Sequence, residues 1–329
     1  MQSPNFGRVR LIPGKEGSRF PFCTSLFIDD EIRTIIDPGA GPAAFAEHLG
    51  GARVDYVLNT HYHFDHINGN HLFPGAKILI NKEELEALQS PRKAAEHLGV
   101  QEVYGQAGVE EWIRAISSPD TPQAPYSPAF RHEWRLATGR AAGSYPYDED
   151  LYFGATRVRM VFTPGHTAGN CCAFFPDEGM VYVGDIDLTA FGPWYCGTDG
   201  DIDLFIQSAK ALLNLDAGFF VTAHQEGVFS RPDFQERMDR FLGVIEQRET
   251  KLADLLEADM TLAQVLERGI VYQPRYQVDP WIRMWELLSV EKHARRLAQK
   301  GHAAAAIFLQ EFSLPRKKGI ARTPRNSLL

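Results

Sequence analysis

The sequence has few of the features that mark membrane-spanning or disulfide-stabilised proteins. No apolar run approaches the roughly 18 residues that a membrane helix needs, and the opening segment MQSPNFGRVRLIPG lacks the apolar stretch of a secretory signal. There are only four cysteines, and none has C-x-x-C spacing. These absences argue against a membrane protein and against a disulfide scaffold, and they predict a cytoplasmic location.

The sequence also has no excess of basic over acidic residues. Lys and Arg total 34 against 42 Asp and Glu, which gives a net charge of −8. Residues 316–325 (RKKGIARTPR) hold five of the basic residues, so the rest of the chain carries 29 basic and 42 acidic residues, a net of −13. An acidic body disfavours a broad nucleic-acid-binding face. We expect a small-molecule substrate, no membrane partner and a solvated basic tail over 316–329; a homodimer is left open.

The sequence does contain a regular alternation of strand and helix patterns. Short apolar runs predict strands at CTSLFID, RTIID and VDYVLN, and PAAFAEHLGG, between the last two, predicts a helix. Later strands are predicted at HLFPGAKILIN, ATRVRMVFT, CCAFFP, GMVYVGD and GFFVTA. This order indicates an α/β fold. We expect a catalytic domain over 1–245 and a small helical region over 246–315, where the strand signals nearly vanish.

Residues 82–148 form a long excursion inside the predicted catalytic domain. Two helical stretches are predicted from 82 to 116, and periodicity then collapses over 117–148, which contain five prolines. Because structureless segments of this length usually serve a site, we hypothesise that this insert caps the functional cleft. A surface insertion or dimer contact without a role in binding is the alternative. Its candidate substrate contacts are Tyr104, Trp112, Arg131, Trp134 and Arg135.

The segment THYHFDHING at 60–69 gives the strongest chemical signal. It places His61, His63, Asp65 and His66 within six residues, directly after a predicted strand. Imidazole nitrogens and carboxylate oxygens are ligands that Zn²⁺ and similar cations prefer. In an extended loop, His61 and His63 point the same way, while Asp65 and His66 lie where the chain would turn into a helix. One short segment can therefore supply two adjacent metal positions.

Three later residues with metal-binding side chains also follow predicted strands. His166 comes after MVFTPG, where Pro164 and Gly165 predict a tight turn; Asp185 follows MVYVG, and His224 follows GFFVTA. Proteins built on sheets tend to place functional residues at strand ends and in the loops beyond them. A carboxylate at Asp185 has two oxygens and is suited to bridge two cations. Structural histidines and surface acids are the alternative interpretation of the seven residues.

In its motifs and their order, the chain resembles the metallo-β-lactamase superfamily, in the hydrolase branch of glyoxalase II and the lactonases. The resemblance rests on the H-x-H-x-D-H motif, the P-G-H turn, the G-D strand end and the last histidine, and it covers roughly residues 8 to 230. It implies a four-layer αβ/βα sandwich with a two-metal site at one edge of the sheets. By this resemblance His61, His63 and His166 hold one metal, Asp65, His66 and His224 hold the second, and Asp185 bridges them.

Three further residues are candidates for supporting roles. Asp37, in IIDPG, either stabilises its own turn or accepts a hydrogen bond from a ligand imidazole, and the resemblance favours the second interpretation. Trp194 and Tyr195 follow Asp185 closely, so these aromatic side chains either wall a substrate pocket or pack in the core. Asp201 and Asp203 precede a predicted helix and are interpreted as capping acids.

The residues imply metal-assisted hydrolysis. Two divalent cations roughly 3.5–4 Å apart would make hydroxide available near neutral pH; zinc is expected first, with iron or manganese as alternatives. Asp65 is the candidate general base. We predict a hydrolase that uses this dinuclear-site hydroxide on an ester, thioester or lactone. The alternatives are a nuclease of the same fold and a mononuclear iron persulfide dioxygenase, and the sequence does not identify the substrate.

Overall fold

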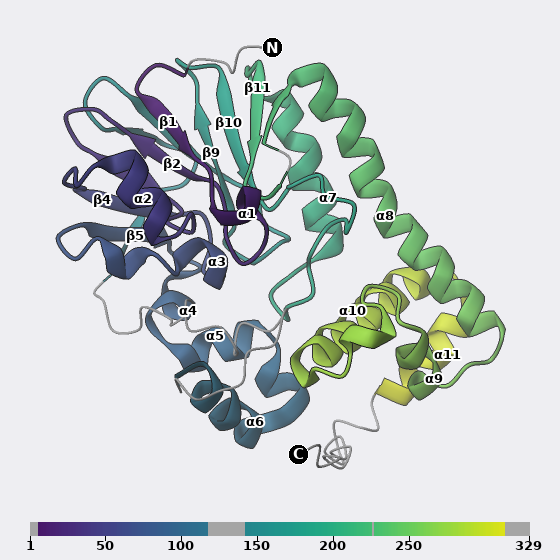
Figure 1. The fold of residues 1–329 in the computed structure, drawn as a ribbon. Coiled ribbons are helices and arrows are strands. Elements are labelled where there is room, and N and C mark those ends of the chain that lie inside the picture. Colours follow the sequence, from purple (N-terminus) through teal and green to yellow (C-terminus); the bar gives the residue numbers. More distant parts are fainter. Residues whose placement is uncertain (1–5, 118–141, 226, 313–329) are drawn as a thin grey trace.

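Two mixed six-stranded sheets face each other in the structure, a computed structural model that describes residues 6–117, 142–225 and 227–312 (Figure 1). The first sheet has the order β1-β2-β3-β4-β5-β6, and the second has the order β12-β11-β10-β9-β8-β7. The strands are β1 (Val9–Ile12), β2 (Ser25–Ile28), β3 (Thr34–Ile36), β4 (Tyr56–Asn59), β5 (Lys77–Asn81), β6 (Ala142–Tyr145), β7 (Asp150–Tyr152), β8 (Arg157–Phe162), β9 (Cys171–Phe175), β10 (Met180–Gly184), β11 (Phe219–Thr222) and β12 (Val228–Ser230).

The strands contribute to two buried layers because successive side chains point to opposite faces of a sheet. In β10, Met180 and Tyr182 pack between the two sheets, whereas Val181 and Val183 pack on the outer side of the second sheet. All of β10 is buried, which explains why the strand is an apolar run without polar alternation.

Helices cover the outer faces of both sheets. Apolar residues of α2 pack against the first sheet, and those of α7 and the first half of α8 pack against the second. The result is the α/β sandwich with a helical C-terminal region that the sequence predicts. The helices are α1 (Lys15–Ser18), α2 (Pro42–Leu49), α3 (Phe64–Ile67), α4 (Leu85–Gln89), α5 (Pro91–His97), α6 (Val100–Ser117), α7 (Ile202–Ala211), α8 (Arg231–Glu257), α9 (Leu262–Arg268), α10 (Pro280–Gln299) and α11 (Ala303–Phe312), with short 3-10 turns at Asn70–Leu72, Leu212–Asn214 and Pro274–Tyr276.

Helix α8 joins the sheet layers to the C-terminal helices and runs without a break through the predicted boundary at residue 245 (Figure 1). Its first half carries Phe234 and Phe241 into the core beside the second sheet. Its second half carries Leu252 and Leu256 into a separate apolar cluster with α9, α10 and α11. The helix therefore has two packing environments, and the change between them falls between Ile245 and Leu252.

The expectation of a structureless segment over all of 117–148 is wrong for its last part. Residues Ala142–Tyr145 form β6, which pairs in parallel with β5 at the edge of the first sheet. The run AGSY lacks the β-branched residues that mark strands, and its pairing partner is remote in sequence, so local patterns did not reveal it. Residues 118–141, which include Arg131, Trp134 and Arg135, lie outside the described residues.

Cys23, Cys171, Cys172 and Cys196 are buried free thiols. Among the described residues, every helix is too short or too polar to cross a bilayer. The predicted basic tail over 316–329 lies outside the described residues.

Candidate metal centre

The H-x-H segment leaves β4 as an extended loop and enters the short helix α3 at His63. The rings of His61 and His63 lie 4.6 Å apart, as the two-residue alternation predicts. Both rings face His166, whose Nε2 lies 3.2 Å from His61 Nε2 and 2.9 Å from His63 Nδ1. These three imidazoles, called here the first ligand group, therefore aim three ring nitrogens at one point.

The turn before His166 is shaped by close packing against the start of α7. Gly165 has a φ of +127°, and a Cβ built there would lie 2.1 Å from the backbone nitrogen of Phe205. The Gly165 carbonyl accepts a hydrogen bond from the backbone N–H of Asp201, whose side chain caps α7 as predicted. Only a residue without a side chain fits at this close approach. The resulting contact between the turn and α7 fixes the backbone position from which the His166 side chain projects.

Asp65, His66 and His224 form the second ligand group. His224 Nε2 lies 3.1 Å from Asp65 Oδ2, and His66 Nε2 lies 3.7 Å from the same oxygen. The start of α3 approaches the loop after β3 so closely that a Cβ on Gly39 would lie 1.7 Å from the Asp65 carbonyl oxygen. Glycine at 39 therefore lets the two loops pack together and brings Asp65 to the sheet edge.

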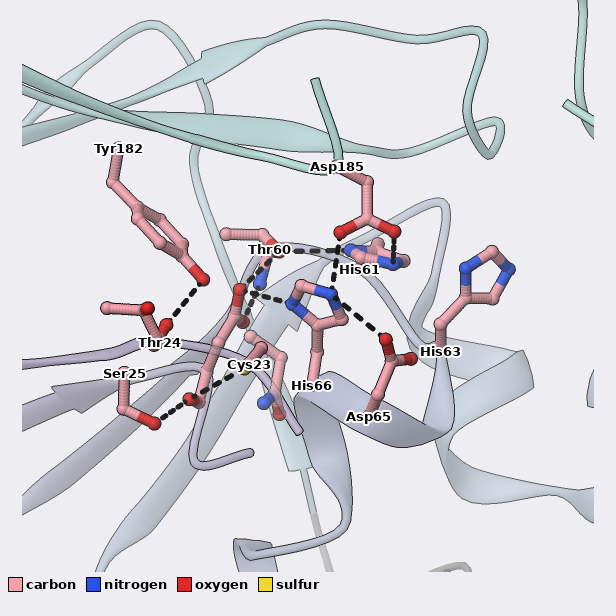
Figure 2. Close-up of polar contacts among 12 residues, drawn as sticks. Cys23, Thr24, Ser25, Thr60, His61, His63, Asp65, His66, Tyr182 and Asp185 are labelled. Atoms are coloured by element: carbon pink, nitrogen blue, oxygen red, sulfur yellow. Dashed lines mark hydrogen bonds and ion pairs between the residues drawn. The ribbon is translucent and has the colours of Figure 1, made fainter. Parts of the chain in front are cut away.

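Asp185 lies between the two groups and projects from the end of β10, across from the segment that follows β4 (Figure 2). Its Oδ2 lies 3.1 Å from His166 Nε2, whereas its Oδ1 lies 2.8 Å from His66 Nε2 and 3.3 Å from His224 Nε2. The two oxygens thus face different ligand groups. In each group the donor atoms, with those of Asp185, lie within 4.8 Å of one another.

Partners on the outer side of the rings fix their orientation. Asp37 Oδ2 lies 2.8 Å from His66 Nδ1 and also accepts a hydrogen bond from Thr60 Oγ1, which lies 3.0 Å from His61 Nδ1. The backbone carbonyl of Trp194 lies 2.8 Å from His166 Nδ1. A ring nitrogen that donates to an oxygen leaves the other nitrogen free to bind a cation, so the inward nitrogens of these histidines are available as ligands.

Burial and neighbouring charges lower the pKa of some of these histidines and raise the pKa of others. Burial, together with the nearby imidazoles, lowers the pKa of His61 and His63 well below the usual value. Burial opposes protonation of His66 too, but Asp185, Asp37 and Asp65 outweigh it and raise the pKa of His66 to about 10. Burial also disfavours charge on Asp185, yet His66, His166 and His224 hold its pKa well below the usual range. The carboxylates therefore attract positive charge into this buried cluster.

The donor set fits divalent cations better than it fits a purely structural hydrogen-bond network. His66 Nε2 and Asp185 Oδ1 are buried and make no hydrogen bond of good geometry to any described residue. Buried polar atoms are normally hydrogen-bonded, and here they converge with the inward imidazole nitrogens of the other ligands. Cations at these points would coordinate the inward atoms and would displace protons from the histidines.

Glu84 is a supporting residue that the sequence analysis missed. It is fully buried just before α4, where its Oε2 accepts the Tyr62 N–H at 3.0 Å and its Oε1 accepts the Gly169 N–H at 2.6 Å. Tyr62 stands between His61 and His63, and Gly169 closes the loop that begins at His166. One carboxylate therefore joins the two loops of the first ligand group, although nothing in the sequence distinguishes Glu84 from its exposed neighbour Glu83.

The two aromatic pocket candidates lie in different places. The Trp194 ring stands beside the first ligand group, with centroids 4.9 Å from His63 and 5.4 Å from His166. The structure places Tyr195 in the core instead, fully buried, with its hydroxyl 2.9 Å from His293 Nε2. Successive residues in an extended segment point in opposite directions, which separates the two side chains.

The insert candidates within the described residues pack inward rather than around the ligand cluster. Trp112 is buried in the core beside the first sheet, and the hydroxyl of Tyr104 donates to the carbonyl of Pro280 in the C-terminal region. Helix α6, which carries both, therefore supports the C-terminal helices.

Comparison with known proteins agrees with this geometry. Residues 19–224 match the family model of the metallo-beta-lactamase superfamily, and the chain belongs to that superfamily. A hydroxyacylglutathione hydrolase from Brucella anthropi is 26% identical over 72% of this chain and 73% of the relative. A protein of the same name from Methylococcus capsulatus is 27% identical over 68% of this chain and 65% of the relative.

Solved structures show the same fold. A metallo-beta-lactamase family protein from Thermus thermophilus superposes with a TM-score of 0.64 at 19% identity, covering 89% of this chain and 94% of the other. A beta-lactamase domain protein from Burkholderia ambifaria gives a TM-score of 0.61 at 17% identity, over 90% of this chain and 88% of the other. The family match and the hydroxyacylglutathione hydrolase relatives, rather than these structures, identify the chain as a metal-dependent hydrolase of the superfamily.

Proposed function

We propose that the chain is a dinuclear metal hydrolase that cleaves an ester, thioester or lactone. The observation that carries the proposal is the position of Asp185, whose two oxygens face two separate ligand groups. A site for one cation would need only the first group. Here the second group is complete and equally buried.

In this proposal each ligand group would hold one cation, and Asp185 would be a ligand to both. Two bound cations would supply a water deprotonated near neutral pH and would polarise the substrate carbonyl. Asp65 serves as the general base: its carboxylate lies at the second group, 3.1 Å from His224, where it can orient the attacking water and accept its proton. Zinc is the cation we expect first, because imidazole and carboxylate ligands suit it, with iron or manganese as alternatives.

A thioester is the substrate class that the relatives favour. The Brucella anthropi and Methylococcus capsulatus relatives are named for hydrolysis of hydroxyacylglutathione, which is a thioester. The Trp194 ring, packed against His63 and His166, offers an apolar surface beside the first ligand group for the acyl part of such a substrate. The buried free cysteines agree with a reducing compartment, so a cytoplasmic location is part of the proposal.

Two measurements test the proposal. Protein purified without added metal is expected to contain about two divalent cations per chain, and a panel of thioesters, lactones, simple esters and phosphodiesters is expected to show turnover of a carboxylic substrate. One iron per chain with persulfide oxidation would replace the proposal by a mononuclear dioxygenase. Cleavage of the phosphodiester alone, with salt-dependent RNA binding, would replace it by a nuclease.

A further inference from the structure

The loop of residues 191–200, called here the Trp194 loop, connects the region of Asp185 to the start of α7. Within it, the Trp194 carbonyl lies 2.8 Å from His166 Nδ1 and is the hydrogen-bond acceptor that orients this ring. The Trp194 carbonyl can orient His166 only if the loop that carries this carbonyl keeps a fixed position. The loop contains no described helix or strand, so contacts from elsewhere must hold it in place.

Arg248, in the middle of α8, holds the carbonyls on one side of Trp194. Its guanidinium is buried and donates from Nη1 to the Pro193 carbonyl at 2.6 Å and from Nη2 to the Phe191 carbonyl at 2.6 Å. Nη1 also lies 2.8 Å from the Tyr195 hydroxyl. The planar, forked guanidinium suits this use, because it presents several N–H groups in fixed directions.

Lys292, on α10, holds the carbonyls on the other side. Its Nζ donates to the Tyr195 carbonyl at 2.9 Å and also to the carbonyls of Gly197 and Gly200. The Trp194 carbonyl therefore stands between two neighbours in the chain, Pro193 and Tyr195, whose carbonyls are each bound by a cation from the C-terminal helices. The Trp194 carbonyl oxygen is therefore left to accept the hydrogen bond from His166 Nδ1.

The Trp194 side chain is fixed by the same region. Its Nε1 donates to the Tyr272 hydroxyl at 2.8 Å, and its ring meets the Trp285 ring edge to face at a centroid distance of 5.5 Å. Backbone and side chain of Trp194 are thus both held by residues beyond 245, although the ligands themselves all precede residue 225.

We propose that Arg248 and Lys292 are positioning residues for the first ligand group, through which α8 and α10 set the orientation of His166. The inference rests on the proposed metal site. If the Arg248 guanidinium or the Lys292 ammonium is removed, buried carbonyls of the loop lose their hydrogen-bond donors. Leaving a buried acceptor without a donor costs free energy. The loop then shifts, the hydrogen bond to His166 Nδ1 weakens, and Nε2 no longer faces His61 and His63 in the geometry that binds a cation.

The test compares zinc affinity in matched variants of the full chain. Arg248→Lys keeps the buried charge but removes the fork, and Lys292→Met removes the ammonium from a side chain of similar length. We expect each to weaken binding of one zinc ion by about tenfold, the lower end of the effect of losing an outer partner, and to leave the second ion unchanged. Competition with a chelator measures both affinities, and His166→Ala gives the reference curve for loss of the first group.

Arg240→Lys on α8 and Lys300→Met after α10 are the controls, since neither side chain contacts the Trp194 loop. Both controls should retain parental affinity. Parental affinity within twofold in Arg248→Lys and Lys292→Met would overturn the inference while leaving the metal site intact. If the parent chain binds none of zinc, iron and manganese, the metal site and the inference are both overturned.

A measurement on the parent protein tests the inference without any variant. In the zinc-loaded chain, long-range nitrogen–proton NMR spectra should show His166 protonated at Nδ1, and hydrogen exchange should show protected amides in the Trp194 loop. His166 protonated at Nε2, or a loop that exchanges freely, would contradict the inference even if the variants fail to fold.

Discussion

Two buried polar clusters of this molecule differ in how their charges are balanced. In the ligand cluster, seven imidazoles and carboxylates turn their inward atoms toward one another, and His66 Nε2 and Asp185 Oδ1, although 2.8 Å apart, make no hydrogen bond of good geometry to a described residue. In the cluster between α8 and α10, by contrast, Glu249 is paired with Arg296 and with Lys300. The first cluster is incomplete without added cations, whereas the second carries its own.

The difference separates a binding site from a structural contact. Burying charge is costly unless it is paired, and cations from Arg and Lys are the means by which a chain pairs its own carboxylates. Among the described residues, Asp65 and Asp185 form ion pairs with histidines and with no Arg or Lys, so their charge is balanced either by protons on the imidazoles or by cations that come from solution. Substitutions in the two clusters should therefore differ in their effects, on metal content in the first cluster and on stability in the second.

The largest effect is expected from removal of a histidine of the first ligand group. His61→Ala and His166→Ala should each lose about one metal ion per chain. Turnover should fall by at least about 10³-fold, because several kcal/mol of charge stabilisation are removed with the ion. The fold should remain, since both residues stand on loops. Metal analysis with circular dichroism checks this, with the exposed His48→Ala as control; unchanged metal content in both variants would contradict the ligand assignment.

Asp65→Asn should have a smaller effect on metal content but a clear effect on kcat. The amide keeps the shape of the side chain, weakens one ligand and removes the proposed base, so kcat should fall by about 10²-fold or more. Steady-state kinetics at saturating metal separate loss of the base from loss of the ion. A kcat within a few-fold of the parent would exclude a general-base role for Asp65.

The sequence predicted the fold class and the residues that converge, because both depend on strongly local signals. Four strand ends carried metal-binding side chains, and strands related by parallel pairing, such as β10 and β11, place their ends at one edge. The sequence did not predict β6, since the run AGSY has no strand pattern of its own. Nor did it reveal Glu84, because the role of Glu84 lies in two backbone contacts that are 22 and 85 residues away.

Glu84→Gln probes the support of the ligand cluster rather than its ligands. Glutamine keeps one acceptor oxygen, so only one of the two loop N–H groups can be bound, and the amide nitrogen faces the other donor. Affinity for the first ion should fall by about tenfold, with KM little changed. Glu83→Gln, at the exposed neighbouring position, is the matched control. Equal zinc affinities for the two variants would show that Glu84 does not hold the loops together.

The smallest effect is expected at Glu249, in the paired cluster. Burial raises the pKa of this carboxyl, but His293, Lys300 and Arg296 outweigh it and lower the pKa to about 2. Because the folded pKa lies below the unfolded value of about 4.3, the ionised group stabilises the fold above pH 4.3, and this stabilisation is lost as the pH falls toward 2.

Glu249→Gln should therefore lower the free energy of unfolding at pH 7 by about 1–2 kcal/mol, a figure reduced for the solvent exposure of Lys300. The difference from the parent should shrink as the pH falls from 4.5 toward 2. Urea unfolding in the presence of a chelator measures it at each pH, with the exposed Glu246→Gln as control. Metal content at pH 7 should stay at the parental value, because this cluster pairs its own charges; a lost metal ion would show that the two clusters are not separate in function.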